Sequence, residues 1–252
     1  NILKKDFDWV SEYYNINQKG YWEKDNYVFY QTVSDAEFAS KLGISLAEFE
    51  KKLSKVNLSI RKEREKRVHP IIDNKIIFSW NALTIRGLVD SYKITKDQKF
   101  LTKALVINNS LVKNMINKNI IQHTNSSFSS VLFLEDYSYY IDALIGLYEV
   151  TFDQKFLNFA DQLTMFTNEK FKESNGFYRF STNQQTLFAD SLIDLADGVT
   201  PSANSIMNFN LFRLGHYYGN KEYLLQSKKM INNISDNLKE RVTDHLLWLN
   251  NS

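Results

Sequence analysis

The sequence predicts an all-α protein built from helical hairpins, and three observations lead to this fold class. The 252 residues include only 8 Gly and 2 Pro, too few for a loop-rich β protein. Apolar residues recur at helical intervals along most of the chain. Three stretches also carry similar phrases, which read TKDQKFL (95–101), TFDQKFL (151–157) and GNKEYLL (219–225).

These phrases set the register of a repeat. Their aromatic residues fall at Phe100, Phe156 and Tyr223, which gives spacings of 56 residues (100 to 156) and 67 residues (156 to 223). Repeats of about this length are typical of arrays of two-helix units, none of which buries its apolar face alone. Because Asp, Asn and Lys are ordinary residues of turns, we interpret each phrase as the turn inside one hairpin.

The N-terminal segment, residues 1–70, precedes the repeats. Its clustered aromatic residues around QKGYWEKDN (18–26) predict a loop or a short hairpin. A first helix is expected from Ser34 to Leu42. A second begins after Ser45, which forms a capping-box pattern with Glu48, and is expected to run up to Pro70.

Residues 71–252 contain three recognisable hairpins, and we interpret 1–252 as a single helical-hairpin domain or a fragment of one. Asn175 and Gly176 predict a tight turn, after which 177–182 and 186–190 are expected to form a small β-hairpin inserted before the third unit. The expected helix pairs fall at 80–92 and 99–117, at 140–148 and 156–166, and at 202–218 and 221–238.

Composition excludes several classes of function. The net charge is +2 without a concentrated basic surface, which argues against nucleic-acid binding. The chain has no Cys, so it has no thiol nucleophile, disulfide or cysteine metal site. No apolar run approaches the roughly 20 residues that cross a bilayer, and the N-terminus does not resemble a signal peptide. We expect a cytoplasmic protein without membrane contact.

Polar and aromatic residues gather at the start of the first helix of each hairpin. The segments are SWN (79–81), EDYSYY (135–140) and DGVTPSANS (197–205). In hairpin arrays these first helices line the inner wall, and their unpaired N–H groups suit anions and polar ligands. For single residues such as Ser79, Asp136 and Ser202, helix capping is the favoured explanation. The coincidence of all three segments favours the rim of a shared cavity.

The same segments resemble the YyaL-like family of thioredoxin-domain proteins (DUF255), which is related to the spermatogenesis-associated thioredoxin-like proteins. KRVHPIIDNKIIFSWNALTIRGL (66–88), FLEDYSYYIDALIGLYEVTFDQKFL (133–157) and DGVTPSANSIMNFNLFRL (197–214) look like successive signatures of that family. GYWEKDNYVFYQ (20–31) is similar to the segment that follows the thioredoxin module there. The chain departs from the family pattern at Asn74, where Asp is usual, and at Ala82 and Ala203, where Gly is usual.

The resemblance implies an α/α toroid related to N-acylglucosamine 2-epimerases and six-hairpin glycosidases. It also implies that this chain is the central-to-C-terminal region of such a protein, without the thioredoxin domain. The sequence leaves open whether the ring of hairpins is complete. The family's activity is itself poorly defined, so the resemblance indicates the fold more sharply than the reaction.

Two functions from different classes follow. The first is a carbohydrate-active or carbohydrate-binding domain of a thioredoxin-linked protein, glycosidase-like or epimerase-like if it is an enzyme. The second is a non-catalytic scaffold that docks a thioredoxin module or a protein client. The expected partners are therefore a sugar or small polar ligand, and a thioredoxin module. No cofactor is expected, and no metal, because the sequence lacks HxxxH and calcium-loop spacings.

Glycoside hydrolysis needs two carboxylates on opposite sides of the bond that is cleaved. Glu135 and Asp136 are adjacent, so the candidate catalytic pair comes from different hairpins, Asp136 and Asp197; capping is the alternative role for both. Epimerisation needs basic groups, yet the four histidines lie away from the helix starts and are interpreted as structural or exposed. The candidate substrate-binding residues are Asp73, Lys75, Trp80, Asn81, Glu135, Tyr137, Tyr140, Ser202, Asn204 and Ser205.

Overall fold

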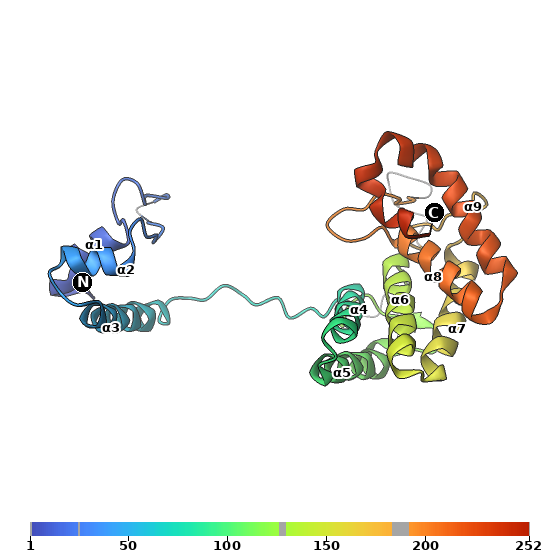
Figure 1. Ribbon diagram of the computed structural model, residues 1–252, viewed down its shortest axis with the longest axis horizontal. Coiled ribbons are helices and arrows are strands. Elements are labelled where there is room, and N and C mark those ends of the chain that lie inside the picture. Colours follow the sequence, from blue (N-terminus) through green and yellow to red (C-terminus); the bar gives the residue numbers. More distant parts are fainter. Residues whose placement is uncertain (1, 25, 126–129, 183–191, 252) are drawn as a thin grey trace. The chain divides into compact units, whose positions relative to one another are not determined.

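The computed structural model describes residues 2–24, 26–125, 130–182 and 192–251 (Figure 1). It contains two compact units, 1–73 and 74–252, and each is considered by itself. Among the described residues, no helix combines the length and apolar character that crossing a bilayer requires.

The first unit is a small helical cluster. After the short 3-10 helix η1 (Lys4–Asp6) come α1 (Phe7–Tyr13), α2 (Asp35–Lys41) and α3 (Leu46–Arg64). Ser34 and Ser45 each form a complete capping box, with Glu37 and Glu48, which confirms the expected helix starts. The second helix ends at Arg64, before the expected limit at Pro70. The core of the unit consists of Tyr13, Phe38, Ala39 and Phe49.

The second unit contains the three expected helical hairpins. They are α4 (Phe78–Thr95) with α5 (Gln98–Met115), α6 (Leu134–Thr151) with α7 (Gln154–Phe171), and α8 (Ala203–Tyr218) with α9 (Lys221–Glu240). The 3-10 segment η2 (Val242–Asn251) follows. The first helices pack side by side, α4 on α6 and α6 on α8, and each second helix packs on its own partner (Figure 1). This arrangement agrees with the predicted all-α toroid of hairpins.

The repeated phrases form the turns inside the hairpins, as expected. Lys96, Phe152 and Gly219 occupy the left-handed region directly after the first helix, with φ of 58°, 56° and 62°. The next residue in each case, Asp97, Asp153 or Asn220, caps the second helix with its side chain. One left-handed residue followed by one capping residue reverses the chain in all three units.

The two-stranded sheet of the structure lies at 116–121, whereas the β-hairpin was expected at 177–182 and 186–190. That sheet joins β1 (Ile116–Asn117) and β2 (Ile120–Ile121), with Ile116 opposite Ile121. Residues 177–182 instead make isolated bridges, Tyr178 with Lys172 and Ser181 with Phe133, and the Phe180 N–H donates to Leu192 O at 2.7 Å. The predicted partner strand, 186–190, lies outside the described residues.

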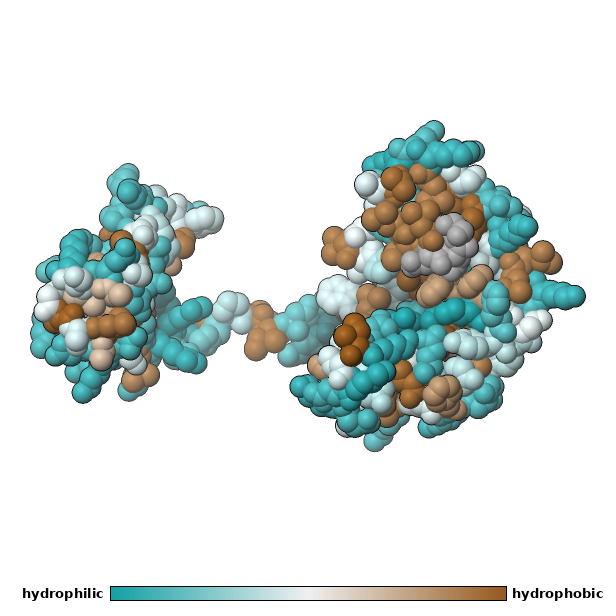
Figure 2. Space-filling view, viewed as in Figure 1, coloured by the Kyte–Doolittle hydropathy of each residue, from teal (hydrophilic) through white to brown (hydrophobic). Residues whose placement is uncertain are grey.

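The core is centred on α6, which is buried around most of its circumference because α4, α7 and α8 surround it. Tyr137, Tyr140, Leu144 and Leu147 are almost completely buried in it. Apolar side chains also reach the surface of this unit, and Figure 2 shows them interspersed with polar ones. Val242, Leu246 and Leu249 of η2 are among the exposed apolar residues.

Candidate active site at the starts of the inner helices

The start of α4 is hydrogen-bonded to the start of α6. The Ser79 N–H donates to Asp136 Oδ1 at 3.0 Å, and the Ser79 hydroxyl donates to Glu135 Oε1 at 3.0 Å. Ser79 thus does not cap its own helix, the role first considered for it, since α4 begins after Ile77 without a side-chain cap. The unpaired N–H of one inner helix is satisfied by a carboxylate of the next.

The start of α8 adjoins the same place. The Tyr139 hydroxyl donates a hydrogen bond to the carbonyl oxygen of Pro201, two residues before α8 begins at Ala203. Glu135, Tyr139, Asp194 and Asn204 line a common cavity of about 30 Å³. A cavity of this size accommodates one or two water molecules, and a sugar ring is far larger. A sugar would therefore lie on the open side of the helix starts and place at most a hydroxyl group in this cavity.

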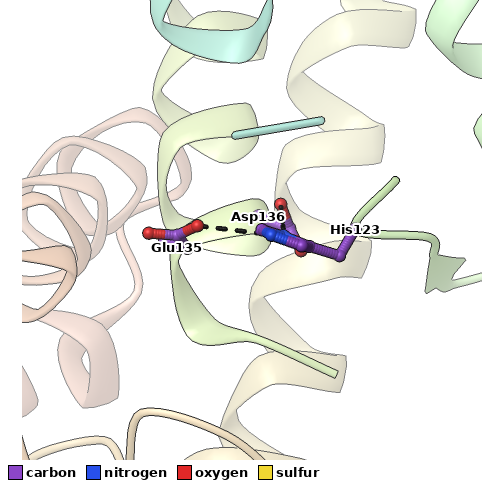
Figure 3. A group of neighbouring side chains, drawn as sticks. All are labelled: His123, Glu135 and Asp136. Carbon is purple, nitrogen blue, oxygen red and sulfur yellow. Dashed lines mark hydrogen bonds and ion pairs between the residues drawn. The ribbon is translucent and has the colours of Figure 1, made fainter. Parts of the chain in front are cut away.

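His123 completes the cluster, although it follows β2 and lies outside every helix. Its Nδ1 is 3.0 Å from Asp136 Oδ2, 3.2 Å from Asp136 Oδ1 and 3.8 Å from Glu135 Oε1 (Figure 3). The backbone fixes this position, because the Phe78 N–H donates to His123 O at 2.9 Å. The ring also packs against Phe133, with 4.7 Å between ring centroids.

Burial differs sharply within this cluster. The Asp136 side chain is 1% exposed, whereas those of Glu135 and His123 are 24% and 28% exposed. The hydrogen bond to Asp136 raises the pKa of His123 against the opposing effect of burial. Burial raises the pKa of Asp136, and hydrogen bonds from His123 and Ser79 counteract it. A His–Asp dyad results, in which Nδ1 binds the carboxylate and Nε2 is the nitrogen that can exchange a proton.

His123 was interpreted from the sequence as structural or exposed, and its place beside the carboxylates was missed. No local signal identifies it, since it stands 12 residues before Glu135 and follows a different element. The β1–β2 turn, the pairing of Ile77 with Thr124 and the hydrogen bond from Phe78 bring it to the helix starts.

Asp197 serves as a structural clamp. Its Oδ1 accepts hydrogen bonds from the Ser202 N–H at 2.9 Å and the Ser205 hydroxyl at 3.3 Å. Its Oδ2 accepts a third from the Leu247 N–H at 3.0 Å, which ties the start of α8 to η2. Both oxygens are thus engaged within the fold, which corresponds to the loop-capping alternative for this residue.

The predicted ligand contacts of Tyr137 and Tyr140 do not agree with their burial. Both side chains are fully buried. Tyr137 donates to Asn119 O and accepts from the Ile121 N–H, and Tyr140 donates to Asn108 Oδ1 at 2.9 Å. These tyrosines belong to the core because α6 is surrounded on nearly all sides, a condition that its local sequence does not reveal.

The α8 residues Ser202, Asn204 and Ser205 are each 1% exposed. Ser202 caps the helix, and Asn204 binds the Tyr178 N–H and carbonyl at 2.8 and 2.9 Å. Their hydrogen bonds hold the loop before α8 and shape the small cavity. Asn204 alone of the three lines it.

The remaining candidates are Trp80, Asn81, Lys75 and Asp73, and of these Trp80 directly follows Ser79 of the cluster. Trp80 is 60% exposed at the start of α4. Asn81 donates to Ile77 O at 2.8 Å and, with Lys75, lines a separate groove beside α5. Asp73 is the last residue of the first unit and so does not belong to the hairpin unit that contains the cluster.

Helical hairpins whose first helices pack side by side, with their polar starts joined at one end, define the α/α-toroid class. No protein-family model matches the chain. Among proteins of similar sequence, an uncharacterised protein of Caenorhabditis elegans is 26% identical over 92% of this chain and 34% of its own length. Spermatogenesis-associated protein 20 of Homo sapiens is 28% identical over 64% of this chain and 22% of its own length. The chain thus spans about a third or less of these relatives.

Solved structures of similar fold are carbohydrate-active enzymes. A GH76 α-mannanase of Bacteroides thetaiotaomicron matches with a TM-score of 0.55 and 15% identity, over 92% of this chain and 70% of that one. A GH76 α-1,6-mannanase of Salegentibacter matches with a TM-score of 0.51 and 10% identity, over 92% of this chain and 69% of that one. That structure is of an inactive variant with two consecutive aspartates replaced, in complex with α-1,6-mannotetrose. A cellobiose 2-epimerase of Spirochaeta thermophila matches with a TM-score of 0.51 and 11% identity, over 64% of this chain and 43% of that one. These similarities establish the α/α-toroid fold.

Proposed function

We propose that this chain is a carbohydrate-active α/α-toroid domain whose ligand site lies at the starts of α4, α6 and α8. The observation that carries the proposal is the cluster of His123, Glu135 and Asp136, held together with Ser79 from a neighbouring hairpin. An imidazole and two carboxylates at the end of three packed helices are the groups that acid–base chemistry on sugars requires.

Within this cluster we assign different roles according to burial. Glu135 is the partly exposed carboxylate and would accept hydrogen bonds from sugar hydroxyls or exchange a proton with the ligand. Asp136 is buried and would orient the His123 ring. Trp80, with 60% of its surface exposed, would offer an aromatic face to a sugar ring.

The pairing first considered for hydrolysis, Asp136 with Asp197, has less support than a role for Glu135. Asp197 uses both oxygens in bonds to its own fold. Adjacent carboxylates are compatible with catalysis in this fold, since the Salegentibacter mannanase variant with two consecutive aspartates replaced is inactive. This similarity supports Glu135 and Asp136 as the pair to test.

The chain's place in a longer protein belongs to the same proposal. Its similarity to spermatogenesis-associated protein 20 supports membership of the YyaL-like, thioredoxin-linked family (DUF255). In that setting a thioredoxin module would be a covalently linked partner. The alternative function is a non-catalytic scaffold for this module or for a protein client. Measurements of glycan binding distinguish it from the carbohydrate-active domain.

A glycan array, followed by calorimetry with the best glycan, tests the proposal. Glu135→Gln and Trp80→Ala are expected to weaken glycan binding by at least about tenfold, because each removes a group that contacts the ligand. The matched controls are Glu169→Gln, with a 67% exposed side chain, and Trp22→Ala, with a 68% exposed side chain in the first unit. Both controls are expected to leave affinity unchanged.

Failure to bind any glycan would refute the proposal, as would equal losses in site and control variants. Binding of an isolated thioredoxin module in place of glycans would favour the scaffold. A crystal soaked with the glycan then provides the direct check, since the sugar should be ordered beside Trp80 and Glu135.

A further inference from the structure

We propose that His123, Glu135 and Asp136 bind a divalent transition-metal ion of the zinc class. The three residues offer one imidazole nitrogen and two carboxylate oxygens, all within 4.8 Å of one another (Figure 3). Sequence analysis predicted no metal site, because the histidine and the acidic pair are supplied by different elements. The proposal does not depend on sugar binding.

The spacing of the donor atoms fits a small ion. His123 Nδ1 lies 3.0 Å from Asp136 Oδ2 and 3.8 Å from Glu135 Oε1. Ligands around tetrahedral zinc, at about 2.0–2.2 Å from the metal, are separated by about 3.3–3.6 Å. The two distances from Nδ1 bracket this separation, and all three donor atoms lie within 4.8 Å of one another, so modest side-chain adjustment would let one ion contact all three. Three protein ligands would leave a fourth position for water or a ligand, as in catalytic zinc sites.

The donors are also held in place by surrounding contacts. The Ser79 N–H and hydroxyl fix the two carboxylates, and the Phe78 N–H fixes the His123 backbone. Such contacts keep ligand side chains in a binding geometry before the metal arrives. Ser79 binds Asp136 through Oδ1, which leaves Oδ2 for the metal. Its hydroxyl binds Glu135 Oε1, and this oxygen keeps a second lone pair for the metal.

Charge balance favours a divalent ion at this place. Both carboxylates pair with the same imidazole, so a protonated His123 supplies one positive charge for two negative ones. A divalent ion replacing the Nδ1 proton would neutralise both. Buried charges are ordinarily paired or coordinate metals, and Asp136 is 1% exposed. One nitrogen with two oxygens suits zinc, cobalt or manganese better than calcium, which prefers oxygen alone.

Zinc titration of the chelator-treated protein tests the site, with calorimetry to measure affinity and Co²⁺ to report coordination through its visible absorption. We expect about one ion per chain. His123→Ala and Glu135→Gln should each weaken Zn²⁺ binding by at least about tenfold and abolish the Co²⁺ band. The control is His69→Ala, which removes a histidine that pairs with Glu65 at 3.5 Å in the first unit; it should change neither.

Circular dichroism of each variant separates a lost ligand from a lost fold, and both site substitutions replace partly exposed side chains. The proposal is overturned if folded wild-type protein binds no Zn²⁺, Co²⁺ or Mn²⁺, or if His123→Ala binds them as tightly as the wild type. Repeating the glycan measurement in chelator keeps the two proposals distinct. Glycan binding without metal binding would reject the metal site alone.

Discussion

Asp136 and Asp197 illustrate how the same side chain acquires different tasks at neighbouring helix starts. Asp136 accepts hydrogen bonds from another hairpin and from His123, and so lies in a cluster of titratable groups. Asp197 accepts bonds from Ser202 and Ser205 at the start of α8 and from Leu247 of η2. The first arrangement supports chemistry at a surface, and the second supports a loop.

The substitution Asp197→Asn tests whether this carboxylate stabilises the fold or takes part in ligand binding. An amide nitrogen in place of one oxygen would face an N–H or hydroxyl donor, which leaves at least one hydrogen bond broken. We expect the free energy of unfolding to fall by about 1–3 kcal/mol. Urea denaturation followed by circular dichroism measures this change. An unchanged stability combined with lost glycan binding would instead restore Asp197 to the candidate site.

Between the inner helices, an ion network lies away from the helix starts. Asp142 of α6 accepts hydrogen bonds from Arg86 of α4 and from Arg213 of α8. About two turns further along α6, Glu149 pairs with Lys93 at 2.5 Å and with Arg213 at 3.4 Å. The same three helices are thus joined by hydrogen bonds at their starts and by charges farther along, which fixes their register.

Glu149 links this network to pH. Burial alone would raise its pKa, but the hydrogen bond from Lys93 and the charges of Arg213, Lys93 and Arg86 lower it. A carboxyl whose pKa is lowered in the folded state stabilises the fold above its unfolded pKa. That contribution is lost as the pH falls from the ordinary glutamate range through the folded pKa.

Glu149→Gln should therefore lower the free energy of unfolding at neutral pH by about 1–3 kcal/mol. The variant should also lose less stability than the wild type on acidification below about pH 4. Urea unfolding curves at several pH values measure both effects. Parallel pH profiles for the two proteins would show that Glu149 does not contribute to the acid sensitivity.

At the scale of the whole molecule, the chain forms two compact units with separate cores. Residues 66–76, which follow α3 and precede α4, are exposed throughout, and Val68 and Ile71 are 99% and 98% exposed. Exposed segments without regular structure are the preferred sites of proteolysis.

Limited trypsin digestion is expected to cut first at Lys66, Arg67 or Lys75 and to release two fragments. The larger one, which contains α4 to α9, should keep its helical circular dichroism, because its core lies within residues 78–248. Mass spectrometry of an early time point locates the cuts. First cuts inside the hairpins would contradict the division into two units.

Local sequence was sufficient to predict much of this architecture. Capping residues and helical periodicity located the helices of the three hairpins, and the repeated phrase located their turns, because these features depend on neighbours within about one helical turn. The same reasoning did not predict the two-stranded sheet, since pairs as short as Ile116–Asn117 with Ile120–Ile121 leave almost no periodic signal.

The sequence by itself determined the all-α hairpin array and the polar character of its inner-helix starts. Tertiary structure alone decided which of those polar groups meet. It buried Tyr137 and Tyr140 inside the packing around α6, engaged Asp197 with η2, and brought His123 to Glu135 and Asp136. The physical reason is that helix formation depends on nearby residues, whereas burial and the partners of a charged group depend on every element that packs around it.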